Sequence, residues 1–141
     1  MIIDGYTHIL PEKYQTELEK KATFQDPKSN TARYARTIPT LVNLEARFRV
    51  MDSFDEYMQV ISVAAPPVYN IAPPETAVEL CRIANDQIAE TVFRYPDRFA
   101  AGIACLPMTD MEAALQEAER AVKELRLRAV EINTDITGKP L

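Results

Sequence analysis

The chain has 141 residues, of which 47% are apolar and 26% are charged, and its net charge is −5. These values exclude an intrinsically disordered chain and fit one globular domain, residues 1–141. An uncharged run, Met58 to Pro74, contains prolines and polar residues, so no membrane span is expected. The arginines are separated by apolar and acidic residues, so a nucleic-acid partner is not expected either.

The two cysteines and the N-terminal residues indicate the cellular compartment of the protein. Cys81 and Cys105 lie far apart in the sequence, outside any metal-binding or redox spacing. Each stands among apolar residues and is expected to be a buried small hydrophobe rather than a reactive thiol. The chain begins Met1-Ile2-Ile3-Asp4, without the basic region and long apolar stretch of a signal peptide. These features predict a reduced, cytoplasmic protein.

The first part of the chain predicts one strand and two helices. Residues 2–9 form a short apolar run without a helical period, which indicates a strand. Pro11 suits the first turn of a helix, whose apolar stripe comprises Tyr14, Leu18 and Ala22. Residues 23–38 are polar and indicate a long loop. Pro39-Thr40 indicates the start of one amphipathic helix with the stripe Leu41, Leu44, Phe48 and Met51.

The middle of the chain predicts a strand, a long helix and another strand. Residues 58–65 are apolar and rich in β-branched side chains, which indicates a buried strand. A long helix follows Pro73-Pro74 and stops at Pro96, and its apolar face comprises Ala77, Leu80, Ala84, Ile88 and Val92. Residues 99–106 indicate the third strand, which ends before Pro107.

A last helix and a fourth strand complete the pattern. Thr109 and Glu112 have the spacing of a capping box and predict the start of the helix. Its apolar stripe comprises Met111, Leu115, Ala118, Val122 and Leu125. Residues 128–133 indicate the fourth strand, after which the chain trails off without a further element.

The order of these elements predicts the fold class. Apolar strands that alternate with helices indicate an α/β fold, with a parallel sheet covered by helices and right-handed crossovers. The chain has only three glycines, and no glycine-rich loop follows any strand. A dinucleotide-binding fingerprint and a P-loop are therefore excluded. A small open sheet or a part of a (β/α)8 barrel remains.

In parallel α/β folds the working residues gather at the carboxyl ends of the strands. Alternation along the first strand predicts one shared face for Asp4, Tyr6 and His8. The fourth strand offers Glu131, Asn133 and Asp135 at its end. His8 is the only histidine, and a catalytic zinc needs about three protein ligands, so His8 alone cannot hold one. Asp4 is expected to be a buried carboxylate that bonds to backbone amides.

Four segments resemble one known family in their order and spacing. They read IIDGYTHILPE at residues 2–12, RFRVMD at 47–52, YPDRF at 95–99 with a following Gly102 and Leu106-Pro107, and AVEINT at 129–134 with GKPL at 138–141. This pattern is similar to the amidohydrolase-2 family of metal-dependent hydrolases and decarboxylases, which includes aminocarboxymuconate-semialdehyde decarboxylase. The resemblance covers essentially the whole chain.

The resemblance implies a (β/α)8 barrel with a divalent metal, often zinc, at its C-terminal face. The 141 residues correspond to about half of such a barrel, which typically needs about 250 residues. His8 matches the second ligand of the family's first-strand His-x-His motif, and Tyr6 stands at the position of the first. The family's remaining ligands, two histidines and an aspartate, belong to later strands. Because Tyr6 departs from this motif, the resemblance implies weaker metal binding or a site with fewer ligands from the first strand.

The resemblance also suggests a substrate contact. Arg47 aligns with an arginine that binds a substrate carboxylate, a task that suits the bidentate guanidinium. The alternative is a solvated or ion-paired helix arginine, and the sequence does not decide between them.

Two functions remain open at this stage. The first is the N-terminal half of a metal-dependent enzyme that hydrolyses or decarboxylates a small carboxylated substrate. The second is a non-catalytic half barrel that self-associates into a homo-oligomer or needs a C-terminal half. Exposed sheet edges favour association with another chain. In either case the chain by itself is expected to be inactive.

Overall fold

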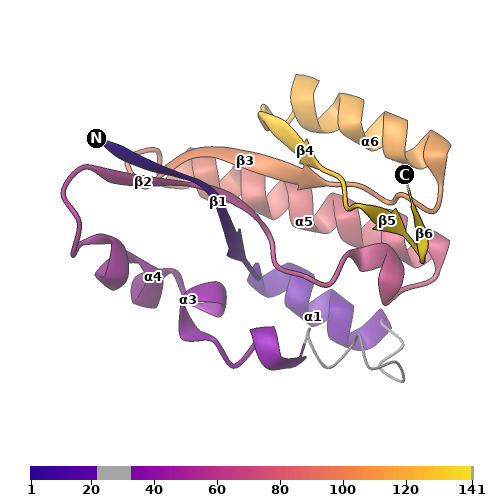
Figure 1. Cartoon of the computed structure of the whole chain (residues 1–141), viewed down its shortest axis with the longest axis horizontal. Coiled ribbons are helices and arrows are strands. Elements are labelled where there is room, and N and C mark those ends of the chain that lie inside the picture. Colours follow the sequence, from indigo (N-terminus) through magenta and orange to yellow (C-terminus); the bar gives the residue numbers. More distant parts are fainter. Residues whose placement is uncertain (22–32, 141) are drawn as a thin grey trace.

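Four parallel strands form the central sheet (Figure 1). They are β1 (Ile2–Ile9), β2 (Tyr57–Val63), β3 (Phe99–Cys105) and β4 (Ala129–Glu131), and they lie side by side in that order. The structure is a computed structural model, and it describes residues 1–21 and 33–140. The predicted parallel sheet is confirmed, although β2 and β4 are shorter than their apolar runs.

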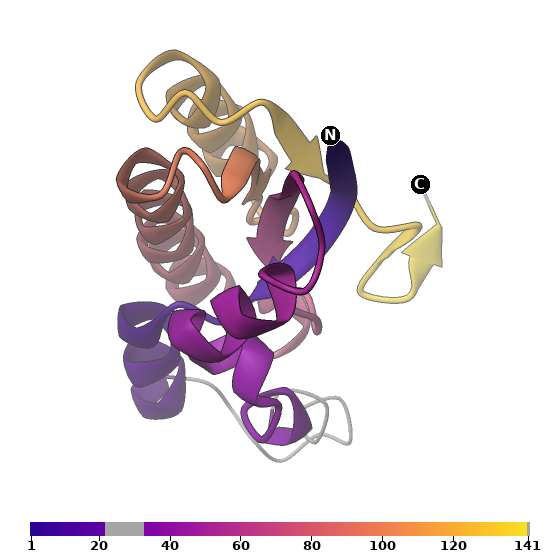
Figure 2. The ribbon, with the colours of Figure 1, turned by 90° about the vertical axis from the view of Figure 1, so that its left-hand side faces the viewer.

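The helices cover one face of this sheet. Figure 2 shows α1 (Glu12–Lys21), α5 (Pro74–Arg94) and α6 (Met111–Lys123) on one side. The predicted apolar face of α5 is confirmed, because Ala77, Leu80, Ala84 and Ile88 are fully buried. Tyr14 and Leu18 of α1 pack into the same core, together with Ile61 of β2 and Phe99 of β3. None of the helices in the described ranges is long and apolar enough to span a membrane.

Within residues 1–21 and 33–140, no helix layer covers the opposite face of the sheet. A small antiparallel hairpin lies on this side, formed by β5 (Asp135–Ile136) and β6 (Lys139–Pro140). The sequence did not predict this hairpin, because strands of two residues are too short to show a period. Gly138 occupies its turn with a φ of +84°, a conformation that glycine adopts without steric cost.

The single helix predicted after Pro39 is wrong, since two helices occupy this region. These are α3 (Pro39–Val42) and α4 (Leu44–Met51), and Asn43 between them has extended backbone angles. The side chain of Asn43 accepts a hydrogen bond of 2.9 Å from the amide of Ala46 and so caps α4. The apolar period continues across this break and conceals it.

Three members of the predicted apolar stripe of α6 face solvent, whereas Leu125 packs against the core. Met111, Leu115 and Val122 are 59%, 66% and 51% exposed. The buried face comprises Ala114, Glu117 and Ala121, whose small alanines permit close packing. The cap is Asp110, which accepts from the amide of Ala113 at 3.0 Å, and not the predicted Thr109. The helix is therefore amphipathic with its larger apolar side chains left uncovered.

Two short segments connect these elements. The 3-10 helix η1 (Val68–Asn70) lies between β2 and α5. The loop predicted at 23–38 falls largely outside the described residues, as does Ala22, and residues 33–35 are helical.

Candidate functional site

The carboxyl ends of β2, β3 and β4 surround a small cavity. Its volume is about 30 Å³, and its lining includes Val63 to Tyr69, Cys105, Leu106, Glu131 and Asn133. Asn133 donates a hydrogen bond of 3.0 Å to the hydroxyl of Tyr69 and so connects the segment after β4 to η1. In parallel folds this edge of the sheet is where catalytic side chains gather.

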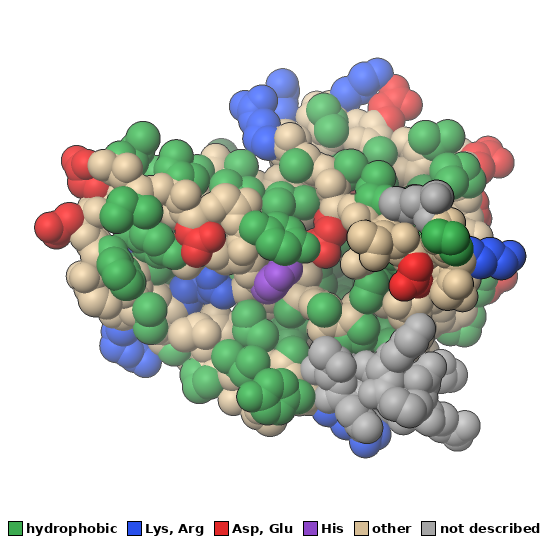
Figure 3. Space-filling view, in the orientation of Figure 1, with side chains coloured by type: hydrophobic (Ala, Val, Ile, Leu, Met, Phe, Trp, Pro, Cys, Tyr) green, Lys and Arg blue, Asp and Glu red, His purple; other side chains and the backbone are tan. Residues whose placement is uncertain are grey.

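The end of β1 contributes Tyr6 and His8. Their rings lie edge to face with centroids 4.7 Å apart. The predicted alternation from Asp4 onward is interrupted, because β1 advances by three residues between Asp4 and Thr7 while β2 advances by two. This bulge re-aims the side chains of β1 near its end. Figure 3 shows the face opposite the helix layer, with the histidine, His8, near its centre among apolar and acidic side chains.

Ser62 orients the imidazole of His8. The Nδ1 of His8 lies 2.8 Å from the hydroxyl oxygen of Ser62, and this hydroxyl lies 3.4 Å from the Thr7 carbonyl. A serine that donates to this carbonyl accepts from Nδ1–H, which leaves the lone pair on Nε2. A second partner that fixes the tautomer in this way is typical of metal-ligating histidines. His8 is therefore suited to act as one ligand through Nε2.

Tyr6 reaches across the sheet to β4. Its hydroxyl donates a hydrogen bond of 2.8 Å to the carboxylate of Glu131. Burial, followed by this hydrogen bond and the negative charge of Glu131, raises the pKa of Tyr6 to about 12. The phenol is thus neutral at physiological pH, and a neutral phenol is a weak metal ligand.

Arg47 lies beside His8 at the end of β1. The guanidinium of Arg47 is 6% exposed and donates to the backbone oxygen of His8, to Gln59 at 2.5 Å and to the Thr40 carbonyl at 2.9 Å. Burial lowers the pKa of Arg47, and the charges of Tyr57 and Asp4 oppose this effect. The structure thus brings two predicted site residues into contact. The guanidinium of Arg47 is hydrogen-bonded to acceptors within the protein. The contact of Arg47 with a substrate stays a prediction.

The remaining candidates are held in local contacts. Asp4 accepts from the hydroxyl of Tyr57 at 2.8 Å and from the amide of Tyr6 at 3.4 Å. Asp135 accepts from the amide of Gly138 at 2.9 Å and closes the hairpin turn. Asp4 therefore lies in a side-chain network as well as bonding to an amide, and Asp135 serves the turn after β4.

The described residues do not by themselves form a metal site. Within residues 1–21 and 33–140, no group of three or more His, Cys, Asp or Glu side chains could hold a metal ion. A catalytic zinc takes about three protein ligands, and the open edge here supplies one well-placed imidazole. Any complete metal site would need ligands from elsewhere.

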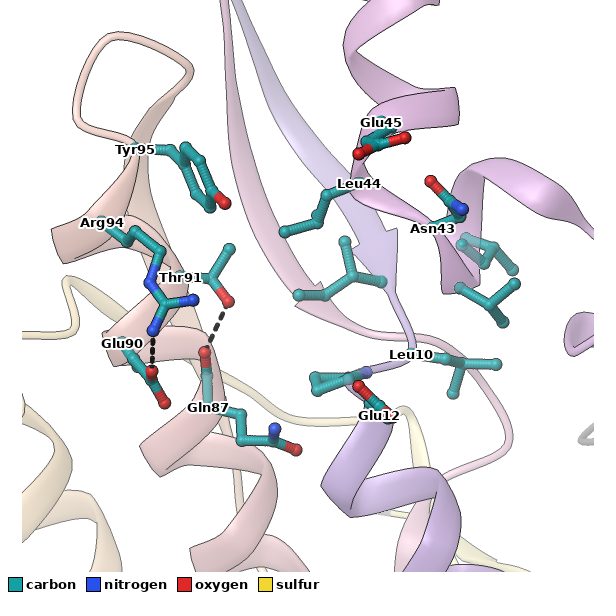
Figure 4. A pocket seen from close by; sticks show the side chains of 14 residues that line it. Leu10, Glu12, Asn43, Leu44, Glu45, Gln87, Glu90, Thr91, Arg94 and Tyr95 are labelled. Carbon is teal, nitrogen blue, oxygen red and sulfur yellow. Dashed lines mark hydrogen bonds and ion pairs between the residues drawn. The ribbon is translucent and has the colours of Figure 1, made fainter.

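A larger cleft lies between the helices and contains none of the predicted site residues. Its volume is about 450 Å³, and it lies between α1, α3, α4 and α5 (Figure 4). On its α5 wall Arg94 pairs with Glu90 at 2.6 Å, and Thr91 donates to the backbone oxygen of Gln87. We place the candidate site at the strand ends beside the smaller cavity, because Tyr6 contacts both His8 and Glu131 there, and Glu131 lines that cavity.

Sequence reasoning missed three contributors to the site. Ser62 and Tyr69 carry no motif, and only the pairing of β1 with β2 brings Ser62 opposite His8. Asn85 on α5 is fully buried and bonds to the amide and carbonyl of Cys105 at 2.9 and 3.0 Å. A polar residue within an otherwise apolar helix face was the one available signal for Asn85.

The cysteines are neighbours in space, although they lie far apart in the sequence. Cys105 is half-buried and lines the cavity, whereas Cys81 is fully buried on α5. The Sγ of Cys105 lies 3.9 Å from the backbone oxygen of Cys81. The two meet because α5 packs directly on β3, the strand that follows it.

Comparison with known proteins identifies relatives whose chains are longer than this one. The chain is 46% identical to gamma-resorcylate decarboxylase of Polaromonas sp. over 81 residues, which are 57% of this chain and 24% of that protein. It is 30% identical to 2-amino-3-carboxymuconate-6-semialdehyde decarboxylase of Dictyostelium discoideum over 151 aligned positions, with 99% of this chain and 42% of that protein covered.

A solved structure agrees with the fold described above. It is a dihydroxybenzoic acid decarboxylase from Polaromonas sp. with bound manganese and the inhibitor 2-nitroresorcinol, and it is 33% identical with a TM-score of 0.70. The match covers 94% of this chain and 38% of that one. The chain thus spans less than half the length of these relatives, and the predicted half of a (β/α)8 barrel is confirmed.

The sequence pattern of one family matches almost the entire chain. Residues 3–141 match the family described as Amidohydrolase. The strand order, the position of His8 at the end of β1 and this match agree with one another. The chain belongs to this amidohydrolase family.

Proposed function

We propose that the chain is the N-terminal part of a metal-dependent decarboxylase that acts on a small aromatic or enoic carboxylate. The names of its relatives support decarboxylation over the alternative, hydrolysis. The reaction would replace a carbon–carboxylate bond with a carbon–hydrogen bond and release carbon dioxide. The geometry of His8 is the single observation that carries this proposal.

His8 would be one metal ligand, with the others supplied from outside the described residues. The Ser62 contact fixes the ring and leaves Nε2 available, as required of a ligand. A related decarboxylase holds manganese, so manganese and zinc are both candidates for the metal. This chain would supply only part of the metal site.

Arg47 is the candidate for binding the substrate carboxylate. It lies against the backbone of His8 and uses part of its donor set on three protein acceptors. A guanidinium held in this way is already oriented, which lowers the entropic cost of binding a carboxylate. The substrate would then lie over the end of β1.

A chimera tests this proposal. The chain would replace the corresponding N-terminal segment of the Polaromonas gamma-resorcylate decarboxylase, and carbon dioxide release from 2,6-dihydroxybenzoate would be measured with manganese present. We expect activity that His8→Ala abolishes and that Lys13→Ala, a change at an exposed position on α1, leaves unchanged. Full activity of the His8→Ala chimera would contradict the role of His8.

A second candidate function is a self-associating half barrel. The exposed Met111, Leu115 and Val122 form an apolar stripe on α6, and β4 beside it is an edge of the sheet. Apolar helix faces and unpaired strand edges favour association. We propose that a second copy of this chain covers the stripe, because the two sheet edges of one copy can pair with those of another.

The mass of the chain in solution tests this candidate. We expect a dimer for the natural sequence and a monomer for Leu115→Lys. Gln116→Lys adds the same charge at an exposed neighbouring position outside the stripe and should remain a dimer. A monomeric natural chain would exclude this candidate, and dissociation by both variants would point to charge rather than the stripe.

A further inference from the structure

The two cysteines of the chain share one buried layer between helix and sheet. Cys81 lies on the face of α5 that packs on the sheet, and Cys105 is the last residue of β3. Asn85, one helical turn after Cys81, bonds to the amide, the carbonyl and the sulfur of Cys105 at 2.9, 3.0 and 3.5 Å. These bonds hold the end of β3 against α5 and keep the two thiols close.

The Cys105 sulfur lies 3.9 Å from the backbone oxygen of Cys81, so the two cysteines are neighbours in this layer. A hydrogen bond with the Cys105 sulfur, followed by burial, raises the pKa of Cys81 well above its ordinary value. Tyr14 lies close enough for both cysteines to raise its own pKa, after the larger effect of burial. The thiol pair is therefore enclosed on the helix side by α1 and α5.

Only one of the two sulfurs is partly exposed. Cys105 lines the cavity at the carboxyl ends of the strands, whereas Cys81 is 0% exposed. The cavity is small, with a volume of about 30 Å³. Cys105 is therefore the more accessible of the two sulfurs, and Cys81 has no exposed surface.

We propose that Cys81 and Cys105 form an oxidisable dithiol that a small hydroperoxide converts into an intramolecular disulfide. The Cys105 sulfur attacks a peroxide oxygen, the O–O bond breaks, and Cys105 sulfenic acid and one water form when hydrogen peroxide is the oxidant. The Cys81 sulfur then attacks the Cys105 sulfur, the S–O bond breaks, and a second water leaves. The thiols lose two electrons and two protons in total, which the peroxide takes up.

The disulfide would fix α5 to the strand end that carries the candidate site. Cys105 is paired in register with Glu131 of β4, whose carboxylate binds Tyr6. Oxidation of the buried cysteines would therefore alter the strand end that forms one edge of the cavity. This inference does not depend on the proposed decarboxylase function, because it concerns only contacts within the chain.

Peptide mapping after graded oxidation tests the proposal. The full chain is treated with hydrogen peroxide, free thiols are alkylated, and the protein is digested without reductant. We expect one peptide pair that joins Cys81 to Cys105, and an intact mass lower by two hydrogen atoms. Oxidised glutathione should react at least about tenfold more slowly, because exposure limits thiol reactivity.

Single variants separate the two sulfurs. In Cys81→Ser, Cys105 should stop at the sulfenic acid, which a cyclic 1,3-dione traps, and in Cys105→Ser the thiol of Cys81 should stay free. If either variant fails to fold, the peptide map of the natural chain decides alone. Two free thiols after peroxide, over-oxidised Cys105 beside a free Cys81, or disulfides between chains would each overturn the proposal.

Discussion

The hydroxyl of Tyr6 on β1 donates a 2.8 Å hydrogen bond to Glu131 on β4, although these strands form opposite edges of the sheet. Two strands separate them, so the bond spans the helix-free face. Side chains can meet across that distance only if the sheet curves, as it does in a barrel. This one contact therefore connects the curvature of the half barrel to its candidate site.

Removing the charge of Glu131 should change the titration of Tyr6. Glu131→Gln is expected to lower the pKa of Tyr6 from about 12 toward its ordinary value of 10.0, because the carboxylate contributes to the upward shift. Tyrosinate absorbance, compared with Tyr6→Phe to assign the signal, measures this. An unchanged titration of Tyr6 in Glu131→Gln would contradict the contact.

The same shift predicts how stability depends on pH. The pKa of Tyr6 in the folded chain is raised, so the folded state holds this proton more tightly than the unfolded state. The contribution of Tyr6 is fully present below pH 10 and is lost as the pH rises through about 12. Tyr6→Phe should flatten this part of the unfolding profile.

Asn85 is expected to hold the end of β3 in place. Asn85→Ala would leave the amide and carbonyl of Cys105 and the carboxylate of Glu117 without their present partner, at a cost of about 3 kcal/mol in the free energy of unfolding. Glu90→Ala on the same helix removes only an exposed ion pair and should cost less than about 0.5 kcal/mol. Urea unfolding compares the two, and equal losses would remove the special role of Asn85.

The glycines offer a matched pair for testing packing. A methyl group on Gly102 would meet Ile88 and lie 2.7 Å from Leu127, whereas one on Gly5 would meet nothing within 4 Å. Gly102→Ala should therefore destabilise the chain by about 1 to 3 kcal/mol through overpacking. Gly5→Ala should change stability by less than about 0.5 kcal/mol, since it touches no packed neighbour. Thermal unfolding of both variants measures the difference, and a neutral Gly102→Ala would show that the neighbours give way.

Arg47 should contribute to stability apart from any role in binding. Arg47→Met would leave the acceptors of His8, Thr40 and Gln59 unpaired in a buried position, at a cost of about 2 to 3 kcal/mol. Arg49→Met, which changes an exposed arginine on the same helix, serves as the control. Similar unfolding curves for the two variants would mean that the contacts of Arg47 carry little net energy.

The sequence predicts those elements in which apolar periodicity and burial coincide. The stripe of α5 is an example, because its alanines and leucine occupy the core as their spacing indicates. In the predicted stripe of α6, Met111, Leu115 and Val122 fail the same test. The hidden face of α6 consists of two alanines and Glu117, and the charge of Glu117 is satisfied by Asn85 and by Arg120, whose pKa the Glu117 bond raises. A search for large apolar residues cannot detect a buried face of this composition.

The candidate site was predictable only in part. His8 and Glu131 stand at strand ends, where parallel folds place their chemistry, and sequence position was enough to nominate them. The partners Ser62 and Asn85 depend on strand register and helix packing, which no local pattern encodes. The proximity of Cys81 and Cys105 has the same origin.

The role of His8 as a metal ligand is tested most directly by the manganese content of the chimera with the Polaromonas segment. The chimera with His8 should hold about one manganese ion per chain. His8→Ala should lower the manganese affinity by more than the 10- to 100-fold loss that is typical when a residue orienting a ligand is removed, as in Ser62→Ala. Equal manganese binding with and without the imidazole of His8 would contradict the account.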